Sequence, residues 1–570
     1  MRSNKGILFE SDYEEAFIQL REPPLGKQDL KWIYTPGDQL PERKETDALI
    51  ESDLRGFLCT KYRDKSLSTD DIKRIIANLR NVGGSNFYES LRNACQLYLE
   101  GYNYTFSDSS KASFRLNYID FEHPEHNTFR VVNQFTMIEG QANRRPDVIL
   151  FINGIPVCII ELKNPTKVSA TTYDAWEQIK VRYNRDIPSL TKYCAVACVS
   201  DGIEHKLGTV ITPYEYFYAW KKVNNEDEPH NNGLDALQTL IEGAFAPDRL
   251  LEILRDYVYF PDAASDEEKE IICRYPQFFA TRKLRDNVIS ALHTNGGDGR
   301  GGTYFGATGC GKTFTMLFLA RQLALRCANK LSNPTIILIV DREDLETQAA
   351  KLFCHSKHYL CDEEVKIFES REDLCKELSS RKGGGFYITT IQKFTESTGL
   401  LSDRANIVCM SDEAHRSQTN LGDKITINTD AEKGKLGAFI TKGFAAYLRA
   451  ALPKATYVGF TGTPIDDTVK VFGAVVDKYT MAQSKEDGIT VDIKYSARLA
   501  RVFTDEAQLK KIEEYYSQCE EDGVSEEQIR KSKSAMASMS VILGEPDRLR
   551  RVAKDIVTDY ELRLQNEPEL

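Results

Sequence analysis

Residues 303–313 read Thr-Tyr-Phe-Gly-Ala-Thr-Gly-Cys-Gly-Lys-Thr, and they organise the second half of this 570-residue chain. Their glycines and the Gly-Lys-Thr ending have the G-x-x-x-x-G-K-[ST] spacing of a phosphate-binding loop. A short apolar strand precedes the loop and an apolar-periodic segment follows it, so bound phosphates would lie at a helix N-terminus. The alternative is a glycine turn that precedes a helix by chance. We predict that ATP and Mg²⁺ bind here, with nucleotide-binding residues Gly306, Gly309, Gly311, Lys312 and Thr313, of which Thr313 also ligates Mg²⁺.

Four further apolar runs follow the loop, at residues 335–340, 386–390, 406–411 and 456–461. Helical or loop sequence separates each run from the next. This alternation predicts an α/β domain with a buried parallel sheet, as in a RecA-like ATPase. Functional side chains are then expected at the carboxyl ends of the strands.

Asp412 and Glu413 follow the third run in the sequence Asp-Glu-Ala-His. We expect Asp412 to hold Mg²⁺ through water and Glu413 to polarise the attacking water, because phosphoryl transfer depends on positioned charge. Thr461 ends the fourth run and Thr463 follows it; both are predicted to sense the γ-phosphate, with a structural turn as the alternative. Together with the phosphate loop, Asp-Glu-Ala-His is typical of the helicase-like ATPases of superfamily 2.

The first half of the chain contains a second motif, at residues 145–165. Two apolar runs joined by Asn153-Gly154 predict a β-hairpin. Asp147 begins the first run, and Glu161 and Lys163 end the second, which is the P-D…E-x-K arrangement of a metal-dependent nuclease. Asp147 and Glu161 would hold Mg²⁺ as catalytic and metal-ligating residues, and Lys163 would orient the attacking water. Ordinary polar strand ends are the competing interpretation.

The nuclease interpretation depends on strand register. A plain two-residue turn at Asn153-Gly154 pairs Asp147 with Ile160 and leaves Glu161 on the opposite face of the sheet. One extra residue on the second strand pairs Asp147 with Glu161. We therefore predict a three-residue loop or a β-bulge.

The composition indicates which classes of protein this chain can belong to. The chain has 41% hydrophobic and 28% charged residues, as in globular proteins, and its length suggests about three to four domains. A net charge of −11 argues against non-specific coating of nucleic acid but not against a basic channel. The 13 scattered cysteines indicate neither disulfides nor a zinc ribbon, and no signal peptide or membrane-length apolar run is visible. We expect a cytoplasmic, prokaryotic protein without membrane contact.

These motifs together resemble the R subunit of type I restriction enzymes, over most of residues 100–560. The nuclease-like part contains Asn133-Gln-Phe, Arg145-Pro-Asp, Ile160-Glu-Leu-Lys, Arg182-Tyr-Asn-Arg and Ser200-Asp-Gly; the motor-like part contains residues 306–313, Asp412-Glu-Ala-His and Thr461-Gly-Thr-Pro. The resemblance implies ATP-dependent translocation on double-stranded DNA and Mg²⁺-dependent cleavage of unmodified DNA. It also implies methyltransferase and specificity subunits as partners, and Gln277 as the residue that reads the adenine edge.

The family also has a Gln-x-x-x-Tyr element after the nuclease lysine. Here Gln178 and Tyr183 are five residues apart, and a regular α-helix cannot keep both in the family's phase unless it bulges. The roles of these two residues therefore remain open at the level of sequence.

The expected architecture is α/β and multidomain. We predict a PD-(D/E)xK endonuclease domain at residues 1–258, a RecA-like motor domain at 259–480, and at 481–570 a helical linker with the truncated start of a second motor domain. No Q-x-x-G-R-x-x-R motif follows Pro464. Two other functions stay open: a stand-alone nuclease-ATPase of another DNA defence system, and a catalytically idle docking module.

Overall fold

The computed structural model describes residue 14 and residues 31–40, 43–163, 171–226, 233–262, 268–307, 309–340, 350–360, 365–368, 370–395, 398–414, 423–428, 437–442, 444–463, 466–490 and 546–566. The chain divides into two compact units, residues 1–491 and 492–570. His415 and most of the charged segment after residue 505 lie outside the described residues.

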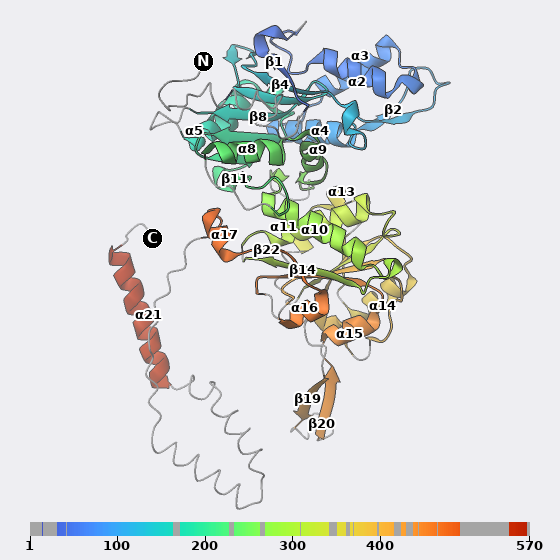
Figure 1. Ribbon diagram of the computed structural model, residues 1–570, viewed down its shortest axis with the longest axis vertical. Coiled ribbons are helices and arrows are strands. Elements are labelled where there is room, and N and C mark those ends of the chain that lie inside the picture. The colour runs from blue at the N-terminus through green and yellow to red at the C-terminus, as the bar shows by residue number, and fades with distance from the viewer. Residues whose placement is uncertain are drawn as a thin grey trace, which may run out of the picture. The chain divides into compact units, whose positions relative to one another are not determined.

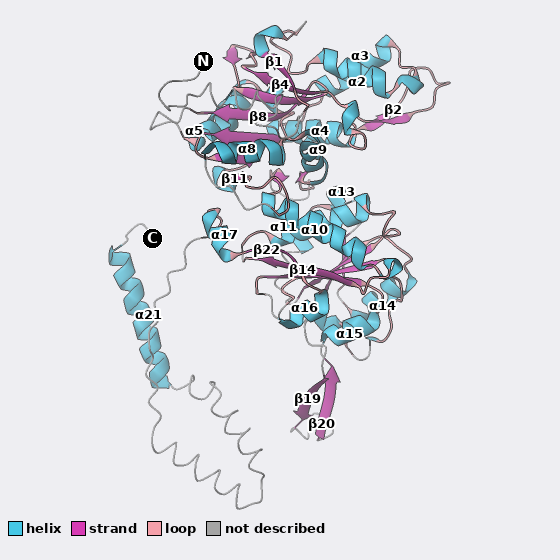
Figure 2. Ribbon diagram, viewed as in Figure 1, coloured by secondary structure: helices cyan, strands magenta, loops and turns pink. Residues whose placement is uncertain are grey.

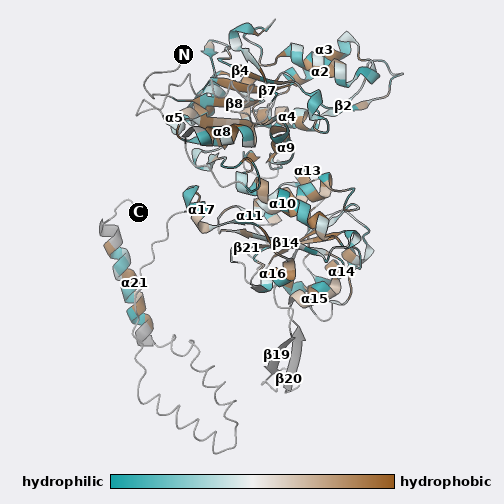
Figure 3. Ribbon diagram, viewed as in Figure 1, coloured by the Kyte–Doolittle hydropathy of each residue, from teal (hydrophilic) through white to brown (hydrophobic). Residues whose placement is uncertain are grey.

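The first unit contains two seven-stranded sheets. The sheet of the N-terminal half has the order β1-β4-β7-β8-β9-β10-β11. Its strands are β1 (Ile33–Pro36), β4 (Phe129–Asn133), β7 (Val148–Ile152), β8 (Ile155–Leu162), β9 (Val196–Ser200), β10 (His205–Gly208) and β11 (Tyr218–Ala219). Every residue of β7, β8 and β9 is buried. β7 and β8 are hydrophobic along most of their length (Figure 3).

Helices and short strands surround this sheet (Figure 1). The helices are α2 (Glu51–Lys61), α3 (Thr69–Arg80), α4 (Phe87–Glu100), α5 (Thr172–Glu177), the π-helical turn η6 (Gln178–Tyr183), α6 (Asn184–Asp186), α7 (Pro188–Thr191), α8 (Gly233–Ala244) and α9 (Pro247–Asp256). The small two-stranded sheets pair β2 (Tyr102–Tyr104) with β3 (Phe114–Leu116), β5 (Met137–Glu139) with β6 (Ala142–Arg144), and β12 (Val258–Tyr259) with β13 (Ile271–Ile272).

The predicted hairpin is formed by β7 and β8. Its turn is the two residues Asn153 and Gly154, both with positive φ. The register is Ile152 with Ile155 and Phe151 with Pro156, and it then shifts to Leu150 with Cys158 and Val148 with Ile160. The shift leaves Val157 as an extra residue on β8, which confirms the predicted β-bulge. Continuing this register, Asp147 falls opposite Glu161, on the same face of the sheet.

The second sheet is parallel and has the order β16-β17-β15-β18-β21-β14-β22. Its strands are β14 (Arg300–Gly306), β15 (Thr335–Val340), β16 (Val365–Ile367), β17 (Phe386–Thr390), β18 (Ile407–Ser411), β21 (Thr456–Thr461) and β22 (Val475–Tyr479). The four apolar runs are therefore strands of one buried parallel sheet, as predicted. The edge strands β16 and β22 were not predicted, because they are short and partly exposed.

Helices cover both faces of this sheet, with α10 and α11 on one side and α14, α15 and α16 on the other (Figure 2). The bounds are α10 (Tyr275–Ala291), α11 (Lys312–Arg321) continued by the π-helical turn η9 (Gln322–Arg326), α13 (Lys357–Leu360), α14 (Arg371–Ser380), α15 (Phe444–Ala451), α16 (Asp466–Phe472) and α17 (Met481–Glu486). A separate antiparallel pair consists of β19 (Asp423–Asn428) and β20 (Gly437–Lys442).

The second unit contains the helix α21 (Pro546–Asn566), which matches part of the predicted charged helical segment. The short 3₁₀ turns of the first unit are η3 (Gly37–Gln39), η4 (Arg63–Lys65), η5 (Pro124–His126), η7 (Tyr214–Tyr216), η8 (His293–Asn295) and η10 (Ile391–Lys393). Among the described residues, none of the helices has the length and apolar character needed to cross a membrane.

Candidate nuclease and nucleotide sites

Two carboxylates meet at one edge of the first sheet. Asp147 immediately precedes β7, and its Oδ2 accepts a hydrogen bond of 2.8 Å from the backbone N–H of Leu162. Glu161 lies near the end of β8 and is 2% exposed. The bulge at Val157 is what brings these two side chains to one face, since a regular hairpin would alternate them onto opposite faces.

Glu161 is also part of a closed ring of hydrogen bonds. Lys163 donates from Nζ to Glu161 Oε1 and to Gln178 Oε1, each over 2.9 Å. Gln178 Nε2 donates to the Tyr183 hydroxyl over 2.7 Å, and that hydroxyl donates to Glu161 Oε2 over 3.0 Å. Both oxygens of the carboxylate are thereby oriented, one by the lysine and the other by the tyrosine.

The π-helical turn explains the five-residue spacing of Gln178 and Tyr183. This turn spans Gln178–Tyr183 and follows directly on α5. A π-helix closes i→i+5 hydrogen bonds, so residues five apart lie on one face, as residues four apart do in an α-helix. The bulge that the spacing required is present, and both side chains reach the carboxylate site.

Burial and charge act together on Glu161. Burial and the neighbouring charge of Asp147 raise the pKa of Glu161 to about 8, while Lys163 and the Tyr183 hydroxyl oppose the rise. A divalent cation between the two carboxylates would reverse this effect, because it favours their charged forms. Carboxylate oxygens are also the donors that Mg²⁺ prefers, so the residues present fit a hard cation.

Residues that the sequence did not predict extend the site. Gln134, with a positive φ of 49°, lies with its Nε2 3.4 Å from Asp147 Oδ1 and 3.3 Å from Glu14 Oε2. Asn133 Nδ2 donates to Glu14 Oε1 over 2.6 Å. Asn133 and Gln134 belong to a segment that resembles the restriction family, whereas no sequence signal pointed to Glu14.

The predicted nucleotide site lies at the carboxyl ends of the parallel strands. Gly311, with a φ of 83°, forms the N-cap of α11. Lys312 and Thr313 are the first two residues of that helix, and Gly306 ends β14. Lys312 Nζ lies 3.5 Å from the Gly306 carbonyl oxygen and 3.5 Å from Glu413 Oε1. The phosphate-loop lysine and the proposed catalytic glutamate thus share one site.

Asp412, Thr461 and Thr463 lie at the same edge of the sheet. Asp412 follows β18, where its backbone N–H donates to the Ile339 carbonyl oxygen over 2.8 Å. The Asp412 carboxylate accepts from the Glu413 N–H over 2.9 Å, and Glu413 has a positive φ of 44°. Thr461 ends β21 and is fully buried, and its hydroxyl accepts from the Thr463 N–H over 3.1 Å.

Gln277 lies beside the phosphate loop, although it precedes the loop by about thirty residues in sequence. It is in the first turn of α10, where its Oε1 accepts from the Arg274 N–H over 2.9 Å. Its Nε2 donates to the Gly311 carbonyl oxygen over 3.3 Å. Gly309 has a positive φ of 83°, and among the described residues only Thr490 would come within 4 Å of an added Cβ there, which leaves room for a ligand beside its backbone. The predicted nucleotide-site residues therefore lie in and beside the phosphate loop, at the ends of β14, β18 and β21, and in the first turn of α10.

Two family models match the chain. Residues 10–216 match the type I restriction enzyme R protein N terminus, and residues 276–529 match the SWI2/SNF2 ATPase. The first match contains Asp147, Glu161 and Lys163. The second contains the phosphate loop and Asp412-Glu413. Residues 217–275 separate the two matches and contain β11, the last strand of the first sheet, and the helices α8 and α9.

Curated relatives are similar along nearly all of the chain. The type I restriction enzyme HindI endonuclease subunit of Haemophilus influenzae is 31% identical over 98% of this chain and 52% of its own length. A putative type I restriction enzyme MjaIXP endonuclease subunit of Methanocaldococcus jannaschii is 29% identical over 95% of this chain and 51% of its own. The chain therefore spans about half the length of these relatives.

Among solved structures, the type ISP restriction-modification enzyme LlaBIII bound to DNA is 18% identical over 42% of this chain and 18% of its own, with a TM-score of 0.26. That likeness is too weak to bear on the fold.

Proposed function

We propose that this chain carries the nuclease and part of the motor of a type I restriction enzyme, and the match of residues 10–216 to the type I restriction enzyme R protein N terminus supports this proposal. It would act on double-stranded DNA in complex with methyltransferase and specificity subunits, translocating with ATP and cleaving unmodified DNA with Mg²⁺. The observation that carries the nuclease assignment is the juxtaposition of Asp147, Glu161 and Lys163, which depends on the bulge in β8.

The site residues divide the chemistry between them. Asp147 and Glu161 would hold Mg²⁺, which supplies a Lewis acid at the scissile phosphate. Lys163, held between Glu161 and Gln178, is placed to orient the attacking water and to offset developing negative charge. Tyr183 holds the second oxygen of Glu161, so the carboxylate does not have to reorganise as the reaction proceeds.

The nucleotide site supports an ATPase. Lys312 would neutralise the triphosphate, and the nucleotide would replace its contact with Glu413. Thr313 and Asp412 would hold Mg²⁺, and Glu413 would then be free to polarise the attacking water. Gln277 would recognise the adenine edge after giving up its bond to Gly311, and Thr461 and Thr463 would respond to the γ-phosphate.

The test is DNA cleavage by the chain assembled with its methyltransferase and specificity subunits. We expect Glu161→Gln and Lys163→Ala each to lower cleavage by at least about 100-fold while ATP binding is unchanged. Glu204→Gln is the control, because Glu204 is an exposed carboxylate that pairs with Lys206 rather than with Lys163. Unchanged cleavage in Glu161→Gln would exclude the nuclease assignment, and would favour an idle docking module.

The nucleotide site is tested separately. We expect Lys312→Ala to remove ATP binding, measured with a fluorescent ATP analogue, while Lys330→Ala, at an exposed lysine outside the site, leaves it intact. Failure of the assembly to include a methyltransferase would point instead to a stand-alone nuclease-ATPase.

A further inference from the structure

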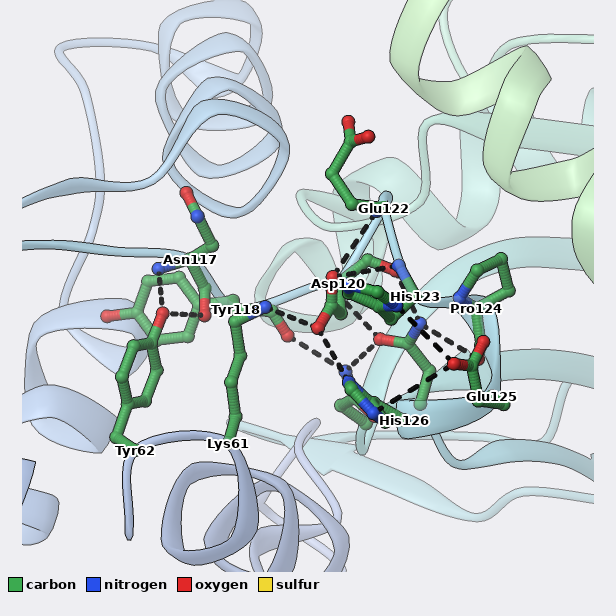
Figure 4. A network of polar contacts seen from close by, with 12 residues as sticks. Lys61, Tyr62, Asn117, Tyr118, Asp120, Glu122, His123, Pro124, Glu125 and His126 are labelled. Carbon is green, nitrogen blue, oxygen red and sulfur yellow. Dashed lines mark hydrogen bonds and ion pairs between the residues drawn. The ribbon is translucent and has the colours of Figure 1, made fainter. Parts of the chain in front are cut away.

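A second group of side chains that could hold a metal ion lies in the segment before β4, outside the carboxylate site. His123, Glu125 and His126 come from the segment between β3 and β4, which contains η5 (Figure 4). Each offers one ligand atom, and these atoms all lie within 4.8 Å of one another. All three residues are exposed, so an ion could reach them without unfolding the domain.

The distances are close to those of a bound ion. His123 Nδ1 lies 3.5 Å from Glu125 Oε1, and His126 Nε2 lies 4.0 Å from the same oxygen. Bonds of about 2.0–2.1 Å in a tetrahedral arrangement put neighbouring ligand atoms about 3.3 Å apart. The ligand atoms all lie within 4.8 Å of one another, so small rotations of these exposed side chains would bring Glu125 and the two imidazoles to the spacing of a bound ion.

A buried carboxylate orients His126. The other ring nitrogen of His126, Nδ1, lies 3.0 Å from Asp120 Oδ2. The Asp120 side chain is only 6% exposed and pairs with Lys61 over 2.5 Å, and its Oδ1 accepts the backbone N–H of His123 over 3.1 Å. With Nδ1–H donating to Asp120, the tautomer leaves a lone pair on Nε2, toward Glu125. A carboxylate behind a ligating histidine is the usual second-shell partner in metal sites.

The donor set separates this cluster from the nuclease site. Two imidazoles and one carboxylate suit Zn²⁺ and the neighbouring transition metals, whereas Mg²⁺ prefers oxygen donors alone. Without an ion, the contacts among these exposed groups would contribute little, since water and salt screen surface ion pairs. A bound cation would therefore stabilise this arrangement more than the contacts among the three side chains do.

We propose that His123, Glu125 and His126 bind one divalent transition-metal ion of the Zn²⁺ class, with Asp120 positioning His126 and water completing the coordination. The ion would tie together the segment that leads into β4. At the end of β4, the Gln134 N–H donates to the Asp147 carbonyl oxygen over 2.8 Å, so the ion braces a strand that leads to the carboxylate site without entering that site.

The test is a calorimetric titration of the metal-stripped full chain with ZnCl₂, in a non-thiol reductant that keeps the cysteines reduced. We expect one high-affinity site in the unaltered chain, and loss of that site in the His123→Gln/His126→Gln double variant. The matched control is His358→Gln, because His358 is a single exposed imidazole whose Nε2 lies 2.9 Å from Glu100. This control should bind Zn²⁺ as the unaltered chain does.

Two further measurements test the role of Asp120 and the preference for a transition metal. Asp120→Asn should weaken Zn²⁺ binding by about 10–100-fold, the usual cost of losing a second-shell partner. A large excess of MgCl₂ should not displace the ion. Because His123 and His126 are exposed, their variants are expected to fold, which circular dichroism would verify.

Absence of Zn²⁺ binding, or equal binding by the double variant, overturns the proposal. Visible absorption of bound Co²⁺ distinguishes the cluster from the cysteines, since thiolate ligation adds a charge-transfer band in the near ultraviolet. Such a band in the unaltered chain, retained in the double variant, would assign the ion to cysteines and reject the cluster.

Discussion

Glu161 illustrates how single side chains define the nuclease candidate. Its two oxygens have different donors, Lys163 and the Tyr183 hydroxyl, and its neighbour Asp147 is fixed by the backbone of Leu162. A buried carboxyl without such partners would simply stay protonated. The donors hold the group in position and a cation would favour its charged form.

Glu270 is a buried carboxyl that has no such arrangement. It is 5% exposed, and neither of its oxygens has a hydrogen-bond partner among the described residues. Burial raises the pKa of Glu270 well above its usual value of 4.5, while the nearby Thr209 hydroxyl opposes the rise. The folded chain thus keeps a proton that the unfolded chain releases above that pH. The free energy of unfolding must therefore fall as the pH rises from 4.5.

We predict that Glu270→Gln removes this pH dependence. The melting temperature of the variant should exceed that of the unaltered chain by more at pH 8 than at pH 5. At pH 8 the unaltered chain must either keep the proton on Glu270 or bury a charged carboxylate, and both destabilise the folded state. The exposed Glu204→Gln serves as the reference and should shift both temperatures equally. An equal effect of Glu270→Gln at both pH values would show that this carboxyl is ionised in the folded state.

At the scale of elements, the turn between β7 and β8 is shaped by one glycine. Gly154 has a φ of 77°, and a Cβ added there would come 2.1 Å from the Ile50 carbonyl oxygen. Backbone approach this close excludes any side chain, and the left-handed conformation adds strain. The turn therefore depends on glycine for two separate reasons.

We predict that Gly154→Ala destabilises the folded chain by about 1–3 kcal/mol, measured by urea unfolding. Gly140→Ala is the control, because Gly140 also has a positive φ, of 59°, but no atom of the residues that the structure describes lies within 4 Å of an added Cβ. The control should show the conformational strain alone. Equal losses in the two variants would mean that the contact with Ile50 relaxes without cost.

The π-helical turn is the second element on which the site depends. Val181 lies within it, 47% exposed. Deleting this one residue should restore α-helical geometry, and Gln178 and Tyr183 would then lie four apart on a regular helix, with the rest of the segment shifted. We predict loss of DNA cleavage with the helical content retained by circular dichroism, while Val181→Ala cleaves normally. Full activity of the deletion variant would show that the π turn is dispensable.

At the scale of the whole first unit, a buried ion pair connects residues far apart in sequence. Lys221 Nζ lies 2.5 Å from Asp487 Oδ1, with the two side chains 7% and 8% exposed. The hydroxyls of Tyr275 and Tyr479 donate to Asp487 Oδ2 over 2.9 Å and 2.5 Å. One carboxylate therefore joins the segment after β11 to α10 and β22.

We predict that Asp487→Asn destabilises the first unit by about 3–5 kcal/mol, because it leaves the ammonium group of Lys221 buried without a counter-charge. Asp467→Asn removes an exposed carboxylate that pairs with Lys470, and should change stability by no more than about 1 kcal/mol. Urea unfolding monitored by fluorescence measures the change in stability of each variant. A loss no larger than that of the control would mean that water reaches Lys221.

Local patterns in the sequence were enough to predict much of this molecule. The phosphate loop, the four apolar strands of the parallel sheet, and the β-bulge that pairs Asp147 with Glu161 all follow from spacing and strand periodicity, which act over a few residues. The roles of these site residues remain predictions. The contacts of Gln134 with Glu14, the burial of Glu270, and the Lys221–Asp487 pair required the tertiary structure. Each of them joins or buries groups that are distant in sequence, and the free energy of such contacts depends on packing and solvent exclusion, which no short stretch of sequence encodes.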